Sequence, residues 1–205
     1  NDQDRLDYLQ LLRLQGDNNG LHFVSYALMD NHVHLVAIPD EEDSLRRAVG
    51  EAHRRYTLGV NRRLEKKGYL FQGRPFSCPM DDDYFRRTLR YVERNPVRAK
   101  MVALAWEYVW SSARFHAGFA TTDPLVDFDC HSYFGLDKRQ WRDFLQADPI
   151  GMELLQKRTR TGRPCGCKSF IDKLESITGR VLHLRQPGRR KPDRKNIVSP
   201  YSSYG

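Results

Sequence analysis

The sequence predicts an α+β fold with a helical C-terminal part. Two short apolar runs on either side of Asp30-Asn31 indicate an antiparallel hairpin, and helical periodicity precedes and follows them. The chain has 205 residues, 40% hydrophobic and 29% charged, which is the composition of a globular protein large enough to bury a core. No apolar run approaches the roughly 20 residues that span a bilayer, and no signal-peptide pattern opens the chain, so we expect a cytoplasmic protein.

The first helix is predicted over the opening segment "DQDRLDYLQLLRLQ". Leu6, Leu9 and Leu12 recur there at helical spacing, and aspartates occupy the first turn. The glycine- and asparagine-rich segment 16–20 is expected to end this helix. The runs "LHFVSYALM" and "HVHLVAI" that follow are rich in β-branched and aromatic residues, so they predict the two strands of the hairpin.

A long basic helix is predicted after the acidic segment 39–44, which supplies a helix N-terminus. Its apolar residues recur every three or four positions, and pairs of basic residues return to one broad face along it. The pairs are Arg46-Arg47, Arg54-Arg55, Arg62-Arg63 and Lys66-Lys67. Residues 68–80 predict a loop followed by a short strand. Asp81 to Asp83 then predict the start of another helix over 84–95, which Pro96 limits or restarts.

The pattern changes in the second half of the chain. Residues 106–118 predict an extended arm that leads into a short helix, and helices are predicted over 136–146 and 167–179. The tail from Arg185 onward lacks an apolar pattern and is expected to be flexible. The predicted parts are a core (1–118), a helical extension (119–184) and a basic flexible tail (185–205).

The four cysteines are too few and too scattered for a disulfide framework. Cys165-Gly-Cys167 is at best half of a zinc knuckle, because no second ligand pair stands at the required spacing. We therefore expect reduced thiols.

Charge is distributed unevenly along this chain of net charge +8. Residues 44–100 contain 15 basic and 6 acidic residues, and residues 157–205 contain 13 and 3, whereas the segments before each of them are acidic overall. Clustered lysine and arginine is typical of a protein that neutralises a phosphate backbone. A solvated charged surface is the alternative interpretation.

His32 and His34 flank a single valine in the second apolar run. On a strand, residues i and i+2 point to the same face, so the two imidazoles project side by side while Val33 faces a core. Such a pair can reach one divalent ion. Histidines at a surface, or histidines that only form hydrogen bonds, are the alternative.

Tyr91 and Asn95 are four residues apart on the later helix, so a phenol and an amide share one face. The amide oxygen can be a third metal ligand, and the tyrosine can be a nucleophile where a metal polarises the electrophile. Alternatively, Tyr91 packs under the sheet and Asn95 caps the helix before Pro96.

Taken together, "NHVHLV", a basic helix, "LFQGRPF" and "RYVERNPVRA" occur in an order that resembles the single-tyrosine HUH transposases, an IS200-like family. Within that family they resemble the REP-associated tyrosine transposases. The resemblance spans roughly residues 1–118, and "TRTGRPCGCKSFIDKLESITGR" resembles the C-terminal helical extension of many such proteins. It implies a ferredoxin-like antiparallel sheet with helices on one face.

The resemblance also implies a role for each residue of the two motifs. His32 and His34 would bind Mg²⁺ or Mn²⁺, Asn95 would complete the metal site, and Tyr91 would be the nucleophile. Attack on a DNA phosphodiester would leave a 5′-phosphotyrosine and a free 3′-OH, and the reverse attack would rejoin strands without ATP. The usual substrates of the family are hairpin-forming or palindromic single-stranded DNA.

Phosphate contacts are predicted from charge and placement rather than from a family motif. The candidates are Arg54, Arg55, Arg62, Arg63, Arg74 and Arg98. Tyr69, Phe71 and Phe76 are candidates for stacking on bases, and core packing is the alternative for all three.

One feature departs from the family pattern. The family has an N-terminal strand with a Gly-Asn-Arg-type turn before its first helix, whereas this sequence begins at Asn1, almost on that helix. The predicted sheet is one strand short, and we expect a truncated product or a fragment.

The sequence thus predicts a metal-dependent single-stranded DNA transesterase, with DNA as its partner, no membrane and no small-molecule substrate. A homodimer is left open. One alternative is a non-catalytic, domesticated or decayed protein that binds repetitive palindromic DNA, which the missing strand favours and the intact motif residues disfavour. The other is a metal-dependent hydrolase, which would form no covalent intermediate.

Overall fold

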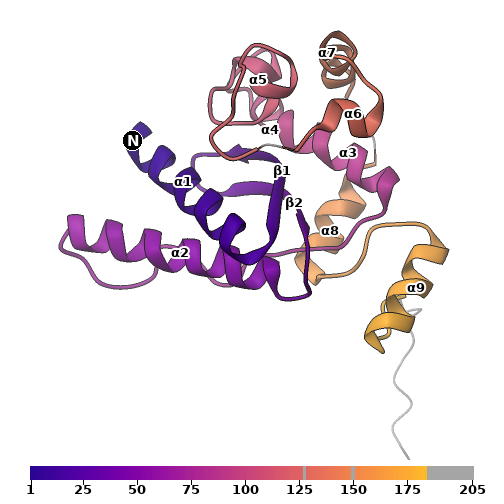
Figure 1. Cartoon of the computed structure of the whole chain (residues 1–205), viewed down its shortest axis with the longest axis horizontal. Helices are drawn as coiled ribbons and strands as arrows, with labels where there is room; N and C mark the ends of the chain where they lie inside the picture. The colour runs from indigo at the N-terminus through magenta and orange to yellow at the C-terminus, as the bar shows by residue number, and fades with distance from the viewer. Residues whose placement is uncertain (127, 149–150, 184–205) are drawn as a thin grey trace, which may run out of the picture.

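The computed structural model describes residues 1–126, 128–148 and 151–183 (Figure 1). At its centre is an antiparallel hairpin of β1 (Leu21–Leu28) and β2 (Val33–Pro39). The Met29 amide closes the turn by donating to the His32 carbonyl oxygen at 2.9 Å. The hairpin predicted from the two apolar runs is confirmed.

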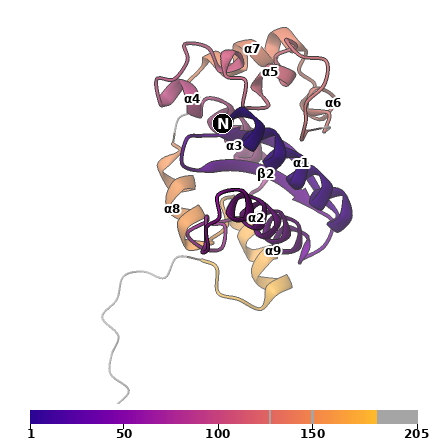
Figure 2. The same cartoon turned by 90° about the vertical axis from the view of Figure 1, so that its left-hand side faces the viewer.

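Two helices pack on one face of this hairpin and a third on the other. Helix α1 (Asp2–Asn19) precedes the hairpin, and α2 (Ser44–Arg63) follows it and packs along α1. Helix α3 (Asp82–Glu93) lies across the opposite face and is followed by the single turn α4 (Asn95–Arg98), so Pro96 restarts the helix. Figure 2 shows the hairpin between these layers.

Strand β1 is buried at seven of its eight positions because both of its faces are covered. Phe23 and Tyr26 pack with α1 and α2, whereas Val24 and Ala27 pack with α3. A register shift between Phe23 and Ser25 marks a bulge, which explains why residues three apart share a face. The α+β class and the helical C-terminal part are confirmed. The helices lie on two faces of the hairpin, rather than on the one face that was expected.

Helix α1 continues into the segment 16–20 that was predicted to end it and ends at Asn19, one residue before the end of that segment. Gly20 has φ +61° in the left-handed region and caps the helix. Gly16 stays helical and serves close packing, since a Cβ there would lie 2.6 Å from the Leu21 carbonyl oxygen and 2.9 Å from the Phe23 ring.

Residues 108–112, within the segment 106–118 predicted as an extended arm leading into a short helix, run beside β1 like a short third strand. The Leu28 amide donates to the Trp110 carbonyl oxygen at 2.9 Å, and the Ser112 amide donates to the Tyr26 carbonyl oxygen at 3.1 Å. The Tyr108 hydroxyl donates to the Leu28 carbonyl oxygen at 2.6 Å.

The short strand predicted at the end of 68–80 is reduced to a single parallel bridge between Met80 and Cys165. Most of this segment is exposed, so it has no apolar face to hold against a sheet.

The second half of the described chain is helical. Its elements are η1 (Ala105–Glu107), α5 (Ala113–His116), α6 (Cys130–Phe134), α7 (Lys138–Gln146), α8 (Glu153–Thr161) and α9 (Lys168–Thr178). Helices α5 to α7 gather at one end of the molecule, at the top of Figures 1 and 2. The predictions of α7 and α9 are confirmed, whereas α6 and α8 were not predicted. The predicted flexible tail lies outside the described residues.

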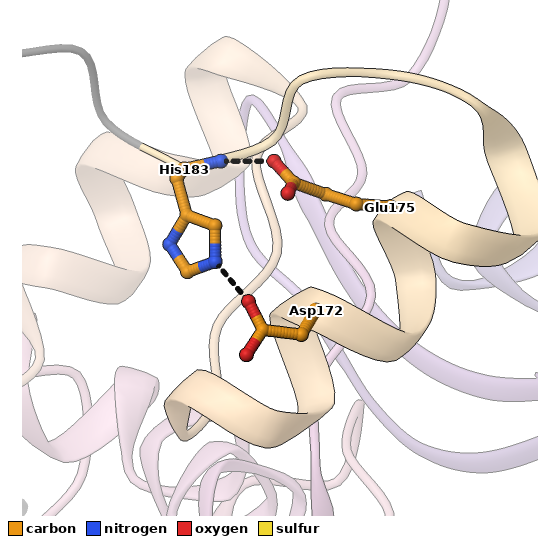
Figure 3. A group of neighbouring side chains, drawn as sticks. All are labelled: Asp172, Glu175 and His183. Atoms are coloured by element: carbon orange, nitrogen blue, oxygen red, sulfur yellow. Dashed lines mark hydrogen bonds and ion pairs between the residues drawn. The ribbon is translucent and has the colours of Figure 1, made fainter.

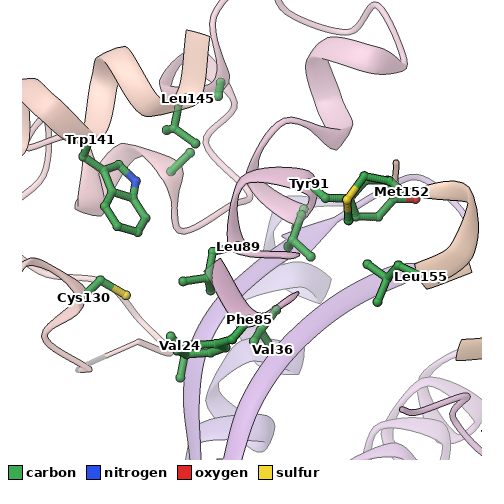
Figure 4. Close-up of a cluster of buried hydrophobic side chains, with 14 of the residues drawn as sticks. Val24, Val36, Phe85, Leu89, Tyr91, Cys130, Trp141, Leu145, Met152 and Leu155 are labelled. Atoms are coloured by element: carbon green, nitrogen blue, oxygen red, sulfur yellow. The ribbon is translucent and has the colours of Figure 1, made fainter. Parts of the chain in front are cut away.

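One buried cluster joins the predicted core to the predicted extension. Figure 4 shows Val36 and Leu89 in the same cluster as Trp141, Met152 and Leu155. The extension therefore packs directly on the helix that carries Tyr91.

Two expectations from composition can be compared with the structure. All four cysteines are free thiols, as predicted. Within the described ranges, no helix combines the length and the apolar character needed to cross a membrane.

Candidate active site

The two histidines stand at the start of β2 and project toward α3. Their Nε2 atoms lie 3.1 Å apart. Two nitrogens that each bind one ion at about 2.1 Å lie about 3 Å from each other when they are adjacent ligands. Val33, between them, packs into the cluster on the opposite face, as predicted. The pair therefore has the spacing of two ligands of a single cation.

Neighbouring groups prepare both rings for metal binding. The Oδ1 atom of Asn31 can only accept, and it lies 2.7 Å from His32 Nδ1, so this contact favours the tautomer of the neutral ring in which Nδ1 carries the proton and Nε2 keeps its lone pair. Burial, with the nearby charges of His32 and Arg98, lowers the pKa of His34 to about 4. At neutral pH His34 is thus uncharged, which is the form that binds metals.

Tyr91 meets the histidines from α3, a distant part of the sequence. Its ring packs edge-on against His34, with centroids 5.8 Å apart, and is only 7% exposed. The Arg98 guanidinium lies 4.9 Å from the centre of the Tyr91 ring. The Tyr91 hydroxyl accepts a hydrogen bond from Gln156 Nε2 at 2.8 Å. One side of the phenol therefore faces the histidine pair and the other faces α8.

Asn95 is the first residue of α4 and is 9% exposed. Its Nδ2 atom donates to the Tyr91 carbonyl oxygen at 2.9 Å, so the side chain closes the end of α3, as the capping alternative predicted. An amide binds a cation only through its oxygen. The contact with Tyr91 uses the nitrogen, so it is compatible with metal binding by Oδ1.

A pocket of about 250 Å³ adjoins Tyr91. Its lining residues are Arg98, Asp148, Met152, Glu153 and Gln156. Two of them, Arg98 and Gln156, also contact Tyr91, so the pocket approaches the phenol from the side of α8.

The predicted phosphate-binding arginines fall into three groups. Arg98 lies within the site, beside Tyr91. Arg54 and Arg55 both donate to Glu51, and Arg63 pairs with Asp4. Arg62 and Arg74 are exposed, and among the described residues neither forms an ion pair. Only part of the predicted basic surface is therefore free of carboxylate partners.

The three aromatic candidates for base stacking also separate. Tyr69 is 98% exposed and Phe76 is 72% exposed. Phe71 instead stacks on His53, with ring centroids 3.7 Å apart, and joins the cluster around α1 and α2. Phe71 therefore takes the core alternative, while Tyr69 and Phe76 remain accessible to a partner.

A buried ionic network, absent from the sequence predictions, fixes the end of α3. Glu93 is fully buried and accepts hydrogen bonds from His116 Nδ1 at 2.5 Å, Ser112 Oγ at 2.6 Å and Trp141 Nε1 at 3.0 Å. Burial alone would raise the pKa of Glu93, but His116 and these donors lower it on balance. Burial alone would lower the pKa of His116, but the Glu93 carboxylate raises it. The two side chains are therefore a charged pair at neutral pH. Glu93, one member of the pair, is two residues from Tyr91 in the sequence.

Sequence patterns could have indicated both of the residues that were missed. Glu93 follows Phe85, Leu89 and Val92 at helical spacing, so it lies on the buried face of α3. Gln156 lies on α8, where Met152 and Leu155 recur three apart and Gly162 follows the last turn. The signal for Glu93 was a charged residue on a buried helix face. The signal for Gln156 was a short amphipathic helix in the last part of the described chain.

A second cluster of metal-ligating side chains lies at the end of α9 (Figure 3). Ligand atoms of Asp172, Glu175 and His183 lie within 4.8 Å of one another. His183 Nε2 contacts Asp172 at 2.6 Å, and a Glu175 oxygen accepts from the backbone amides of Leu182 and His183. These hydrogen bonds close the chain back onto α9 and account for the closeness of the three side chains.

Comparison with protein families matches residues 1–95 to the family described as transposase IS200 like. The match begins with α1, includes the histidine pair and Tyr91, and ends at Asn95. No curated protein and no solved structure matches the chain. The match covers somewhat less than half of the chain, and it supports a relationship of this segment to IS200-like transposases.

Proposed function

We propose that this protein is a metal-dependent single-stranded DNA transesterase that cleaves and rejoins DNA through Tyr91. The observation that carries the proposal is the meeting of His32, His34 and Tyr91, which come from two distant elements of the fold. The match of residues 1–95 to IS200-like transposases supports the same reaction class, because that segment contains all three residues.

The reaction exchanges one phosphodiester for another. The Tyr91 oxygen forms a bond to the phosphorus, the bond from phosphorus to the 3′-oxygen breaks, and the phenolic proton is balanced by the proton gained at the new 3′-OH. The downstream strand is left as a 5′-phosphotyrosine. Attack by a 3′-OH reverses these steps, so rejoining needs no further energy source.

A divalent ion, Mg²⁺ or Mn²⁺, would polarise the scissile phosphate and stabilise its charge. His32 Nε2 and His34 Nε2 would hold it, with Asn95 Oδ1 as an oxygen ligand. Arg98 lies against Tyr91 and beside His34, where its charge would attract the phosphate. The burial of Tyr91 keeps bulk water away from the phenol, which favours transfer to a strand over hydrolysis.

The proposed substrate is hairpin-forming or palindromic single-stranded DNA, as used by REP-associated tyrosine transposases. The motif "RYVERNPVRA" and the helical extension after it support this subtype. The exposed Tyr69 and Phe76 rings, together with Arg62 and Arg74, are suited to single strands because unpaired bases can stack on aromatic rings.

The test uses a pool of hairpin oligonucleotides with randomised stems and flanks, labelled at either end, with Mn²⁺ and the whole chain. We expect the 3′ label to become covalently attached to the protein and the 5′ label to be released, because the phosphotyrosine retains the downstream strand. Tyr91→Phe should abolish the adduct. Tyr84→Phe, which changes a second tyrosine of α3, should leave the adduct intact.

Each alternative predicts a different result from the same gel. A non-catalytic binding protein would shift the DNA and cleave neither label. A hydrolase would release both fragments without an adduct. An adduct that survives in Tyr91→Phe would contradict the assignment of the nucleophile.

A further inference from the structure

The oxygen of Tyr91 is held by a helix that lies outside the segment shared with IS200-like transposases. Gln156 Nε2, from α8, donates to the Tyr91 hydroxyl at 2.8 Å. Among the described residues, the Tyr91 hydroxyl makes no other hydrogen bond. Met152, the N-cap of the same helix, belongs to the same buried cluster as Tyr91 (Figure 4). The matched segment ends at Asn95, so the extension completes the surroundings of the nucleophile.

The segments that flank α8 in the sequence are attached to α3 and to the residues before it. Arg94, at the end of α3, donates to the carbonyl oxygens of Leu145 and Gln146, the last residues of α7. After the helix, the Cys165 amide donates to the Pro79 carbonyl oxygen at 2.8 Å, and the Asp81 amide donates back to the Cys165 carbonyl oxygen at 3.0 Å.

Side chains reinforce this anchoring. Met152 and Leu155 are buried in the cluster that contains Leu89. A carboxylate oxygen of Asp81, the N-cap of α3, accepts from the Cys167 amide at 2.7 Å. The chain before and after α8 is therefore attached to the two ends of the helix that presents Tyr91, and Leu155 packs α8 itself into the cluster that contains Leu89.

The donor suits the electronic change that the reaction requires. Negative charge develops on the Tyr91 oxygen as the phenol loses its proton and attacks, and it develops again when the tyrosine leaves during rejoining. An N–H group directed at that oxygen stabilises the charge in both directions, as donors in an oxyanion hole do. It also fixes the orientation of the remaining lone pair.

We propose that Gln156 is a catalytic residue, whose side-chain amide stabilises and orients the Tyr91 oxygen during attack and rejoining. This inference rests on the proposed function. It assigns part of the chemistry to the C-terminal extension, so the segment up to Asn95 would be an incomplete enzyme.

The test is the single-turnover rate of adduct formation with the labelled hairpin pool, measured with Mn²⁺ at saturation. Gln156→Leu removes the donor and should lower the rate by about 10- to 100-fold, with DNA affinity unchanged. Thr161→Ala, whose hydroxyl bonds only to carbonyls of α8 itself, should behave like the wild type.

The outcomes separate this inference from the function on which it rests. If the wild type forms no adduct, the proposed function fails and Gln156 has no such role. If the wild type forms an adduct and Gln156→Leu matches its rate, or if Gln156→Leu loses rate only because its DNA affinity falls, the catalytic role is wrong. A faster Gln156→Leu variant would instead make α8 a cover over Tyr91, which also contradicts the inference.

Discussion

Helices α2 and α3 are both rich in arginine, yet the structure places their glutamates in opposite surroundings. On α2 the buried residues are Ser44, Ala48, Val49 and Ala52, and the glutamate of the helix stays near the surface with its two arginines. On α3 six residues are buried, among them Tyr91 and the fully buried Glu93. The glutamate of α3 is therefore part of the core, whereas the glutamate of α2 lies near the surface, where a partner can compete for its arginines.

The difference separates two tasks that the proposed enzyme must perform. A nucleophile must be held in a fixed position, so it lies on the helix that is packed on the most sides. Phosphate contacts must form and release as a strand enters and leaves, so they suit a helix with one solvated side. A count of basic residues overestimates the number of arginines available for phosphate contacts, because Arg54, Arg55 and Arg63 already have carboxylate partners.

The largest effect should come from a matched pair of glutamates, one on each helix. Glu93→Ala removes the carboxylate that keeps the buried His116 protonated and leaves three buried donors without their acceptor, so we expect the free energy of unfolding to fall by about 3–5 kcal/mol. Glu51→Ala removes a surface acceptor of two arginines and should cost less than about 1 kcal/mol. Urea denaturation of both variants at neutral pH measures the contrast.

A similar loss in the two variants would break the comparison between the helices. Glu93→Gln serves as a control for shape, since it keeps the size of the side chain and removes the charge. It should lose nearly as much stability as Glu93→Ala if the ion pair, rather than the packing, is the main contribution.

Local sequence patterns predicted the elements that can form from neighbouring residues. The hairpin, α1, α2, α3 and the helices over 136–146 and 167–179 each have a periodic apolar pattern or a cap of their own. The pairing of His32 with His34 was also predictable, because alternate residues of a strand share a face. For these parts the sequence contains the whole signal.

Contacts between distant segments were not predictable in the same way. The partners of Glu93 come from the arm and from α7, and the partner of the Tyr91 hydroxyl comes from α8. No spacing within α3 indicates which distant residue fills the space beside it. The covering of both faces of β1 was missed for the same reason, since it depends on where α3 returns.

A smaller effect should distinguish the free arginines from the paired ones. Arg74→Ala removes a cation that has no ion pair among the described residues, so the affinity for single-stranded DNA should fall by about 3- to 10-fold and the salt slope by about one ion. Arg54→Ala should have a smaller effect, because a phosphate contact of Arg54 must first displace Glu51. Fluorescence anisotropy with the hairpin pool at two salt concentrations measures both.

Glu51→Gln extends this comparison in the opposite direction. It frees Arg54 and Arg55, so the affinity for DNA should rise. Equal losses from Arg54→Ala and Arg74→Ala, with no gain from Glu51→Gln, would show that the ion pairs of α2 do not limit DNA binding.

The smallest predicted effect concerns the one histidine of α2. His53 stacks on Phe71 and contacts the Tyr8 hydroxyl at 2.9 Å, and burial lowers the pKa of His53 to about 4. The unfolded chain binds the proton more readily, so this contribution to stability is present above about pH 6.5 and is lost as the pH falls toward 4. The ring is only half-buried, and solvent reduces the expected loss to about 1 kcal/mol.

His53→Gln provides the matched variant, because its amide can still reach Tyr8 but does not titrate. Thermal or urea unfolding from pH 7 to pH 4 should show a stability difference between the wild type and His53→Gln that shrinks as the pH falls. Titration of His34, whose pKa is lowered in the same direction, affects both proteins equally and cancels in that difference. A difference that stays constant with pH would mean that His53 is protonated as easily in the folded chain as in the unfolded one, and α2 would then have no buried titrating group on the side that faces α1.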